Sequence, residues 1–287
     1  MEHLKCGIFT SSKTQTEQRK DCTVYRVRNA TGTGEMTDYP VFPGIHLMYN
    51  DFHMSVCPCD GQCPMNCLEL NHCCEGRIEV EYNNKLYYMG SGDFSCASKD
   101  CVEQSSVFPL AHYHGISVYI DYRLLTQEAV RLLRNFSIDI VTLYNTFYGN
   151  GKCLLLRNNV SIEHIFAELY TVHDSVRTSY LKIKIIELLI FLSVPENLTM
   201  CMLHECYPAY RVEKVKEIRA FIMDHLEERF TVENLSERFD MPLTAMKLCF
   251  RAVYGMPVAS FIRDLRMQQA SKLLRTTELS VMDIAGT

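Results

Sequence analysis

Four cysteines lie close together in the run Cys57-Pro-Cys59-Asp-Gly-Gln-Cys63-Pro-Met-Asn-Cys67. Four thiolates can hold a zinc ion tetrahedrally. The spacing of these cysteines is not a common zinc pattern, however, and two prolines stiffen the loop. We therefore expect reduced thiols without a metal here, and we keep a zinc site and a redox sensor as the less favoured alternatives.

A second group of candidate ligands is the pair of histidines in His112-Tyr-His114. The pair is similar to the His-x-His metal ligands of cupin enzymes. Those enzymes place a glutamate shortly after the pair, where this chain has Val118 and Tyr119. Because a facial triad without its carboxylate is incomplete, we expect structural histidines, with no metal and no cofactor. No nucleophile triad, phosphate loop or pair of catalytic carboxylates stands out, so we expect no catalytic residues.

A third group lies near the C-terminus, where residues 242–254 have the periodicity of a helix. The apolar residues that should share its buried face are Met246, Cys249, Phe250 and Val253. The residues that should then face solvent are Thr244, Lys247, Leu248 and Arg251. Lysine can donate to guanine acceptors, and the methyl groups of leucine or threonine can contact a thymine methyl. Taken alone, an exposed lysine and arginine are more often an ordinary solvated face.

The residues around this segment resemble the DNA-binding domain of AraC/XylS-type regulators, in which one helix connects two helix-turn-helix units. The resemblance is carried by residues at fixed spacings: Phe250, Tyr254, Gly255, Pro257, Phe261, Arg263, Arg266, Met267, Ala270, Leu273, Leu274, Thr277, Ser280, Asp283, Ile284 and Ala285. It implies that Thr244, Lys247 and Leu248 read bases and that Arg251 contacts phosphate. It also implies that the chain stops at Thr287 within the first helix of the second unit.

Capping and turn residues predict where the helices of the first unit begin and end. Thr231 is a good N-cap for a short helix. Asp240 stands at the following turn, where its backbone would enter the left-handed region at some cost. Pro242 opens the recognition helix, Gly255 ends it, and Pro257 opens the connecting helix.

Residues 209–287 should form one helical core. The side chains expected in it include Leu235, Phe250, Phe261 and Leu273. Ser236 should lie where two helices cross closely, which requires a small residue. Arg263 and Arg266 on the connecting helix could contact phosphate, but we favour pairing with neighbouring acids such as Asp264 and Glu237.

Residues 1–122 are predicted to be rich in β-strands. Alternating or β-branched runs bounded by Asn and Gly turns indicate strands at 77–82, 85–89 and 115–121. Short strands of this kind suggest a small sandwich or barrel. The run from Glu69 to Arg77 and the hairpin after it also resemble the cupin-like sensor half of AraC-type regulators.

Residues 123–208 are predicted to be a helical dimerisation or linker region. Apolar residues recur at helical spacing around Ile162–Leu169 and again from Leu181 to Leu192, after which Pro195 should stop the helix. Such a stripe can be a core face or a dimer contact. We favour the core and leave the dimer contact open.

Composition is that of an ordinary globular protein, and the length is enough for two domains. The β-rich first region followed by helical regions predicts an α+β fold. The net charge is −5, but residues 241–287 contain six Lys/Arg and three acids, so this end carries +3 and the rest −8. A locally basic end is what a DNA reader needs. The chain shows no signal peptide and no apolar run long enough to span a membrane, so we expect a cytoplasmic protein with mostly reduced cysteines.

These observations predict a transcription regulator with a sensor region at 1–122, a helical region at 123–208 and an incomplete helix-turn-helix domain at 209–287. The resemblance implies that the protein is a homodimer and that it binds double-stranded DNA. It also implies a small-molecule effector and RNA polymerase as possible partners. Two alternatives remain. One is a cupin-type metal-binding protein or enzyme that uses His112 and His114, and the other is a truncated regulator that acts only through heterodimers.

Overall fold

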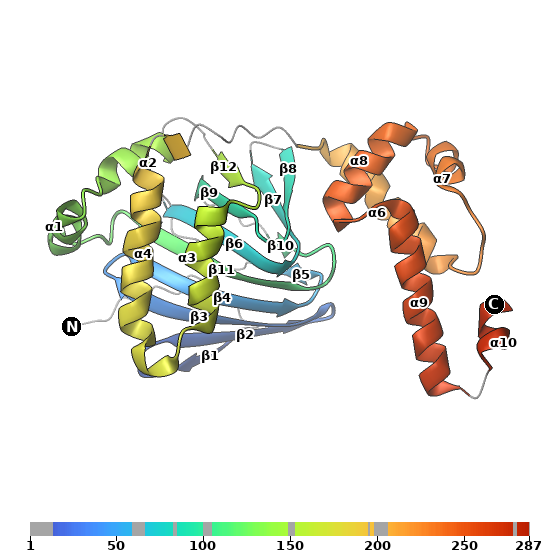
Figure 1. The fold of residues 1–287 in the computed structure, drawn as a ribbon, viewed down its shortest axis with the longest axis horizontal. Coiled ribbons are helices and arrows are strands. Elements are labelled where there is room, and N and C mark those ends of the chain that lie inside the picture. The colour runs from blue at the N-terminus through green and yellow to red at the C-terminus, as the bar shows by residue number, and fades with distance from the viewer. Residues whose placement is uncertain are drawn as a thin grey trace. The chain divides into compact units, whose positions relative to one another are not determined.

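The computed structural model mixes helices with a large antiparallel sheet, as the α+β prediction requires (Figure 1). It describes residues 14–58, 67–82, 85–99, 105–148, 153–194, 196–197, 206–277 and 280–286. Cys59 and Cys63 lie outside these residues, as do Pro195 and the Asn turn expected between the strands predicted at 77–82 and 85–89. The chain divides into two compact units. Unit 1 comprises residues 1–83 and 89–205, and unit 2 comprises residues 84–88 and 206–287.

Unit 1 is built on an eight-stranded sheet with the order β1-β2-β3-β4-β11-β6-β9-β12. Its strands are β1 (Thr14–Gln18), β2 (Thr23–Asn29), β3 (Gly32–Phe42), β4 (Ile45–His53), β6 (Cys67–Gly76), β9 (Phe94–Lys99), β11 (Tyr113–Asp121) and β12 (Cys153–Leu156). A second, smaller group pairs β10 (Ser106–Val107) with β5 (Val56–Cys57) and β7 (Ile78–Tyr82). The strands predicted at 77–82 and 115–121 are therefore confirmed as β7 and as most of β11.

The two faces of the large sheet contribute to different cores. On β11, Ile116, Val118 and Ile120 belong to a cluster shared with the helices, because alternate residues of a strand point to one face. Tyr113 and Tyr119 belong to a second cluster, formed mostly among strand residues on the opposite face. Unit 1 thus has a helix-covered face and a strand-lined interior.

The helices of unit 1 are α1 (Gln127–Asn135), α2 (Ile140–Tyr148), α3 (Val160–Thr171) and α4 (Arg177–Ser193), with a short 3-10 turn at Asp174–Val176. In Figure 1, α3 and α4 lie across the sheet. The apolar stripe of α4 is buried in the core that the helices share with the sheet. Its residues are Leu181, Ile185, Leu188, Leu189 and Leu192. The stripe is therefore a core face, and the boundary predicted near residue 122 falls inside a single compact unit.

One element in this region differs from the prediction. Residues 123–208 were expected to be helical, but Cys153–Leu156 forms β12, which pairs with β9 at the edge of the sheet. Leu154 and Leu156 are buried in the core shared with the helices, whereas Cys153 and Leu155 are half-buried. Four apolar residues are too few to distinguish a strand from a helix by periodicity alone.

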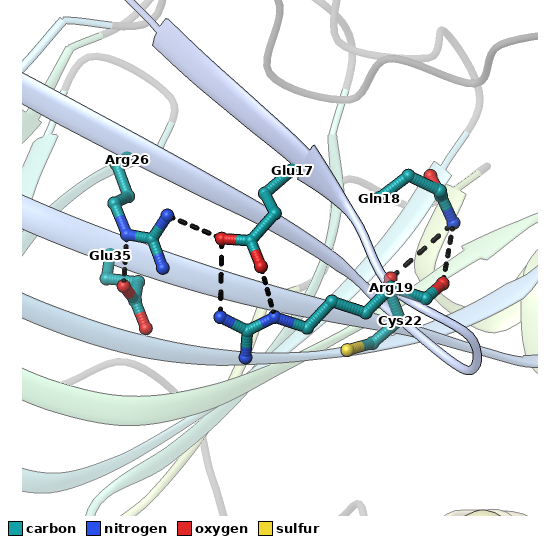
Figure 2. A network of polar contacts seen from close by, with 6 residues as sticks. All are labelled: Glu17, Gln18, Arg19, Cys22, Arg26 and Glu35. Atoms are coloured by element: carbon teal, nitrogen blue, oxygen red, sulfur yellow. Dashed lines mark hydrogen bonds and ion pairs between the residues drawn. The ribbon is translucent and has the colours of Figure 1, made fainter.

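The outer strand β1 carries a network of exposed charges (Figure 2). Glu17 accepts hydrogen bonds from Arg19 and Arg26, with Arg19 Nε at 2.8 Å and one terminal nitrogen of Arg26 at 2.7 Å. Arg26 also donates to Glu35 at 2.8 Å. The hydrogen bonds from Arg19 and Arg26 lower the pKa of Glu17 to about 2. Charged side chains of this kind discourage pairing of an edge strand with another chain.

Unit 2 is helical. Its helices are α6 (Ala209–Asp224), α7 (Val232–Arg238), α8 (Leu243–Tyr254), α9 (Val258–Thr276) and α10 (Val281–Gly286). Leu235, Phe250 and Phe261 share its core, as predicted. Leu273 is only half-buried and lies outside this core, so that part of the prediction is wrong. The buried residues of α9 are Val258, Phe261 and Ile262, near its N-terminus, which leaves Leu273 beyond the packed part of the helix.

A strand segment from the middle of the chain completes the core of unit 2. Residues 84–88, most of β8 (Lys85–Met89), belong to this unit. Leu86 pairs with Tyr207, whose backbone N–H donates to the Leu86 carbonyl at 3.1 Å. Leu86 and Tyr88 are buried in the same cluster as Phe250. Among the helices of the described residues, none has the length and apolar content to cross a membrane.

Candidate nucleic-acid interface

The helix α7 begins at a capping box. The backbone N–H of Asn234 donates to the Thr231 hydroxyl at 3.1 Å, and the N–H of Thr231 donates to the Asn234 side chain at 3.2 Å. Both bonds satisfy donors that a helix start leaves unpaired. Thr231 is therefore the N-cap that the sequence predicted.

A tight turn then leads from α7 into α8. Asp240 has a φ of 45°, the left-handed conformation expected for it. The Ser236 hydroxyl donates to the Met241 carbonyl at 2.6 Å, and the Met241 N–H donates to the Ser236 carbonyl at 3.0 Å. Lys214 of α6 donates to the Asp240 carbonyl at 2.8 Å. These bonds hold the turn from both sides and fix the angle between the two helices.

The helix α8 has one buried and one exposed face. Pro242 precedes its first residue, and Gly255 ends it with a φ of 80° as a left-handed C-cap. Its buried face is formed by the four residues predicted for it, which are all fully buried: Met246, Cys249, Phe250 and Val253. This face anchors α8 to the core and leaves the other side of the helix in solvent.

The four predicted DNA-contacting residues all lie on the exposed face of α8: Thr244, Lys247, Leu248 and Arg251. Leu248 is 57% exposed, which is unusual for a leucine and leaves its methyl groups available to a partner. Lys247 Nζ lies 3.8 Å from Glu233 of α7, and both side chains are more than half exposed. Exposed pairs of this kind contribute about 0–1 kcal/mol, so Lys247 can exchange this acid for another partner at little cost.

The two arginines of α9 have different surroundings. Arg266 donates to the backbone carbonyls of Leu226 at 3.0 Å and Glu228 at 2.6 Å. Arg266 therefore binds within the protein, which we favoured over a phosphate contact. Its partners are backbone carbonyls, however, and not the expected acids. Arg263 is exposed, and it makes no ion pair within the part of the chain that the structure describes.

Two contacts of this site were not foreseen from the sequence. Lys214 of α6 donates to a turn residue 26 positions later, and Arg266 donates to carbonyls about 40 positions earlier, at Leu226 and Glu228 beyond the end of α6. The side chains of Lys214 and Arg266 both donate to backbone carbonyls, which every residue has. No residue type or spacing in the sequence therefore signals these contacts.

No protein-family model matches the chain. Two curated proteins are similar to it over 71 residues, a quarter of its length. They are the HTH-type transcriptional activator AarP of Providencia stuartii, at 32% identity, and the HTH-type transcriptional regulator ExsA of Pseudomonas aeruginosa, at 31%. The matched segment spans about half of AarP (53%) and about a quarter of ExsA (26%).

Among solved structures, ToxT from Vibrio cholerae aligns with 83% of this chain and 87% of its own, at 13% identity and a TM-score of 0.35. The AraC-like transcriptional activator CuxR aligns with 84% and 82%, at 12% identity and a TM-score of 0.31. Scores this low do not establish a common fold. Over a quarter of its length, then, the chain is similar to two helix-turn-helix transcription regulators, and neither is named as an enzyme.

Proposed function

We propose that this chain is a sequence-specific, double-stranded-DNA-binding transcription regulator of the AraC type, with α8 as its recognition helix. One observation carries the proposal. A helix anchored by a buried apolar face, and held to α7 through the Asp240 turn, presents Thr244, Lys247, Leu248 and Arg251 together to solvent. A recognition helix must offer such a face to the major groove.

The residues of this face differ in what they can recognise. Lys247 can donate to the guanine acceptors, and the methyl groups of Thr244 and Leu248 can contact a thymine methyl. Arg251 lies one turn further along the helix, where a guanidinium suits a backbone phosphate. Phosphate contacts add affinity without reading the sequence. We therefore assign base reading to Thr244, Lys247 and Leu248, and positioning to Arg251.

Unit 1 would be the sensing part of such a regulator. Its large antiparallel sheet is compatible with the cupin-like sensor that the sequence resembles. In this proposal a small-molecule effector, or a partner such as a second copy of the chain or RNA polymerase, binds one arrangement of the two units better than another. Such differential binding is what couples a sensor to a DNA-binding unit.

The test begins with duplexes of random sequence, from which the full chain selects those it retains. We expect a common motif among the retained duplexes and tighter binding of that motif than of a shuffled duplex. The variants Lys247→Glu and Arg251→Glu should lose most of this binding, because each places a carboxylate against the DNA backbone charge. Lys182→Glu, at an exposed lysine of α4 in unit 1, makes the same change in net charge and is the matched control.

Two results would contradict the proposal. One is the recovery of no common motif. The other is an equal loss of binding in all three variants, which would show that the net charge of the chain, and not the face of α8, controls its affinity for DNA.

A further inference from the structure

A β-bulge in unit 1 brings three metal-ligating side chains together. Along β6 and β11, His114 pairs with Glu75 whereas Gly115 pairs with Cys73, so that Cys74 is the extra residue of a bulge. In a regular strand, adjacent side chains point to opposite faces of the sheet. A bulge redirects side chains locally, and here the ligand atoms of Cys74, Glu75 and His114 all lie within 4.8 Å of one another.

The three groups suit one class of ion. A thiolate, an imidazole and a carboxylate are all ligands of zinc, which is bound tetrahedrally with metal–ligand distances of about 2.0–2.3 Å. Ligand atoms in such a site lie roughly 3.5 Å apart, so a small rotation of these side chains would bring three of the four ligands to that spacing. Cys74 and His114 are half-buried and Glu75 is exposed, so a fourth position would be open to solvent or to a neighbouring side chain.

The surroundings of the three ligands also favour a cation. Glu163 of α3 adds a second carboxylate, and its Oε2 lies 3.5 Å from Nε2 of His72 on β6. That nitrogen is buried and makes no hydrogen bond. Within the described residues, neither carboxylate is paired with a lysine or arginine. Each faces a histidine instead, since Glu75 Oε2 lies 3.4 Å from His112 Nε2 and Glu163 lies beside His72.

We propose that Cys74, Glu75 and His114 form a binding site for a zinc ion on the helix-covered face of the large sheet. His114 lies on the same side of β11 as Ile116 and Val118, whose side chains pack in the core shared with the helices. The site therefore faces away from the strand-lined interior of unit 1. It also differs from the pair His112 and His114 that the sequence suggested, because the partners of His114 come from β6.

The experiment measures zinc binding by the full chain under reducing conditions, by equilibrium dialysis and by competition with a chromophoric chelator. All proteins carry Cys59→Ser and Cys63→Ser, which remove the cysteines most able to form a separate site in the loop between Cys57 and Cys67. In this background Cys74→Ser, Glu75→Gln and His114→Ala are compared with Cys153→Ser. Cys153 is a half-buried thiol of the same unit and lies on the edge strand β12.

We expect one zinc per chain in the background protein and in Cys153→Ser. Each of the three site variants should bind zinc more than about tenfold more weakly, because loss of even an outer partner of a ligand costs about 10–100-fold. Cobalt(II) provides a second readout, since a thiolate–cobalt charge-transfer band should appear in the background protein and be absent from Cys74→Ser. Circular dichroism of each variant without metal shows whether it is folded.

The proposal is wrong if the folded background protein binds no zinc, or if the three site variants bind it as tightly as Cys153→Ser does. A cobalt spectrum without thiolate character would equally exclude Cys74 as a ligand. Loss of zinc binding only in unfolded variants would redirect the test to Glu75→Gln, whose exposed side chain leaves the core untouched. If folded Glu75→Gln retains full zinc affinity, Glu75 is not a ligand and the three-residue site is wrong.

Discussion

The polar groups of the two units are assembled in opposite ways. On α8, Lys247 and its neighbours are presented by successive turns of one helix and are open to solvent. In unit 1, Cys74 and His114 come from two strands, are half-buried, and meet only because the register shifts between them. An exposed, locally built face suits an extended partner such as a duplex, and its residues can change without harm to the fold. A half-buried group suits a small ion and depends on the whole sheet around it.

The largest expected effect separates the two faces of α8. Phe250 is fully buried in the core of unit 2, and Phe250→Ala should destabilise that unit by about 3–5 kcal/mol through lost packing and the cavity left behind. Leu248→Ala, two residues away on the exposed face, should change stability by less than about 0.5 kcal/mol. Chemical denaturation of both variants is the measurement. Similar losses would mean that α8 has no solvent-facing side.

A smaller loss of stability is expected from a substitution that tests how far the proposed site of Cys74, Glu75 and His114 depends on the sheet. A Cβ atom added at Gly115 would lie 2.5 Å from the backbone carbonyl oxygen of His72. Gly115→Ala should therefore force strands β6 and β11 apart, destabilise unit 1 by about 1–3 kcal/mol, and weaken zinc binding although no ligand has changed. Arg28→Ala, at an exposed position of β2, is the control for both the stability and the zinc affinity. Unchanged stability and zinc affinity in Gly115→Ala would show that the sheet tolerates the added methyl group.

Asp240 and Gly255, the two left-handed positions on either side of α8, should differ in how substitution changes the stability. Gly255→Ala places a Cβ atom at a φ of 80° and should cost about 1–2 kcal/mol. Asp240 already carries this strain at a φ of 45°, so Asp240→Gly should be neutral or slightly stabilising. Thermal melts of the two variants compare them directly. A loss in Asp240→Gly as large as that in Gly255→Ala would show that the Asp240 side chain is itself needed in the turn.

The smallest effect is expected at the charged edge of unit 1. The pKa of Glu17 is lowered to about 2, so its ion pairs stabilise the folded protein above the ordinary carboxyl range and are lost as the pH falls toward 2. Glu17→Gln should remove this dependence on pH, and because the network is exposed the change should be slight and should vanish in high salt. Melting temperatures between pH 5 and pH 2 are the measurement, with Asp21→Asn as the control at an exposed acid nearby. A large effect that persists in high salt would contradict a screened surface network.

The elements of unit 2 could be predicted from the sequence because their signals are local. Thr231, Asp240 and Gly255 each fix the backbone of their own neighbourhood, and the apolar spacing around Phe250 defines a helix face. The place of Leu273 could not be predicted this way. Its spacing is that of a buried residue, and only the extent of the neighbouring helices decides whether anything covers it.

The group in unit 1 could not be predicted, for a related reason. Nothing in the sequence of β6 indicates where the strand will bulge. Without the bulge, Cys74 and Glu75 would point to opposite faces of the sheet. His114 attracted notice through its neighbour His112, which is adjacent in the sequence. Its partners, however, lie about 40 positions earlier, and only the pairing of β6 with β11 connects them.

The central claim is that α8 reads DNA, and the most direct test compares Lys247→Ala with Arg251→Ala. Each variant is titrated with the selected duplex and with a random duplex at several salt concentrations. We predict that Lys247→Ala loses about 1–3 kcal/mol of preference at one base step. Arg251→Ala should instead weaken both duplexes alike and lower the salt slope by about one. If Lys247→Ala weakens the selected and random duplexes equally, Lys247 does not read a base and the assignment of α8 as the recognition helix is contradicted.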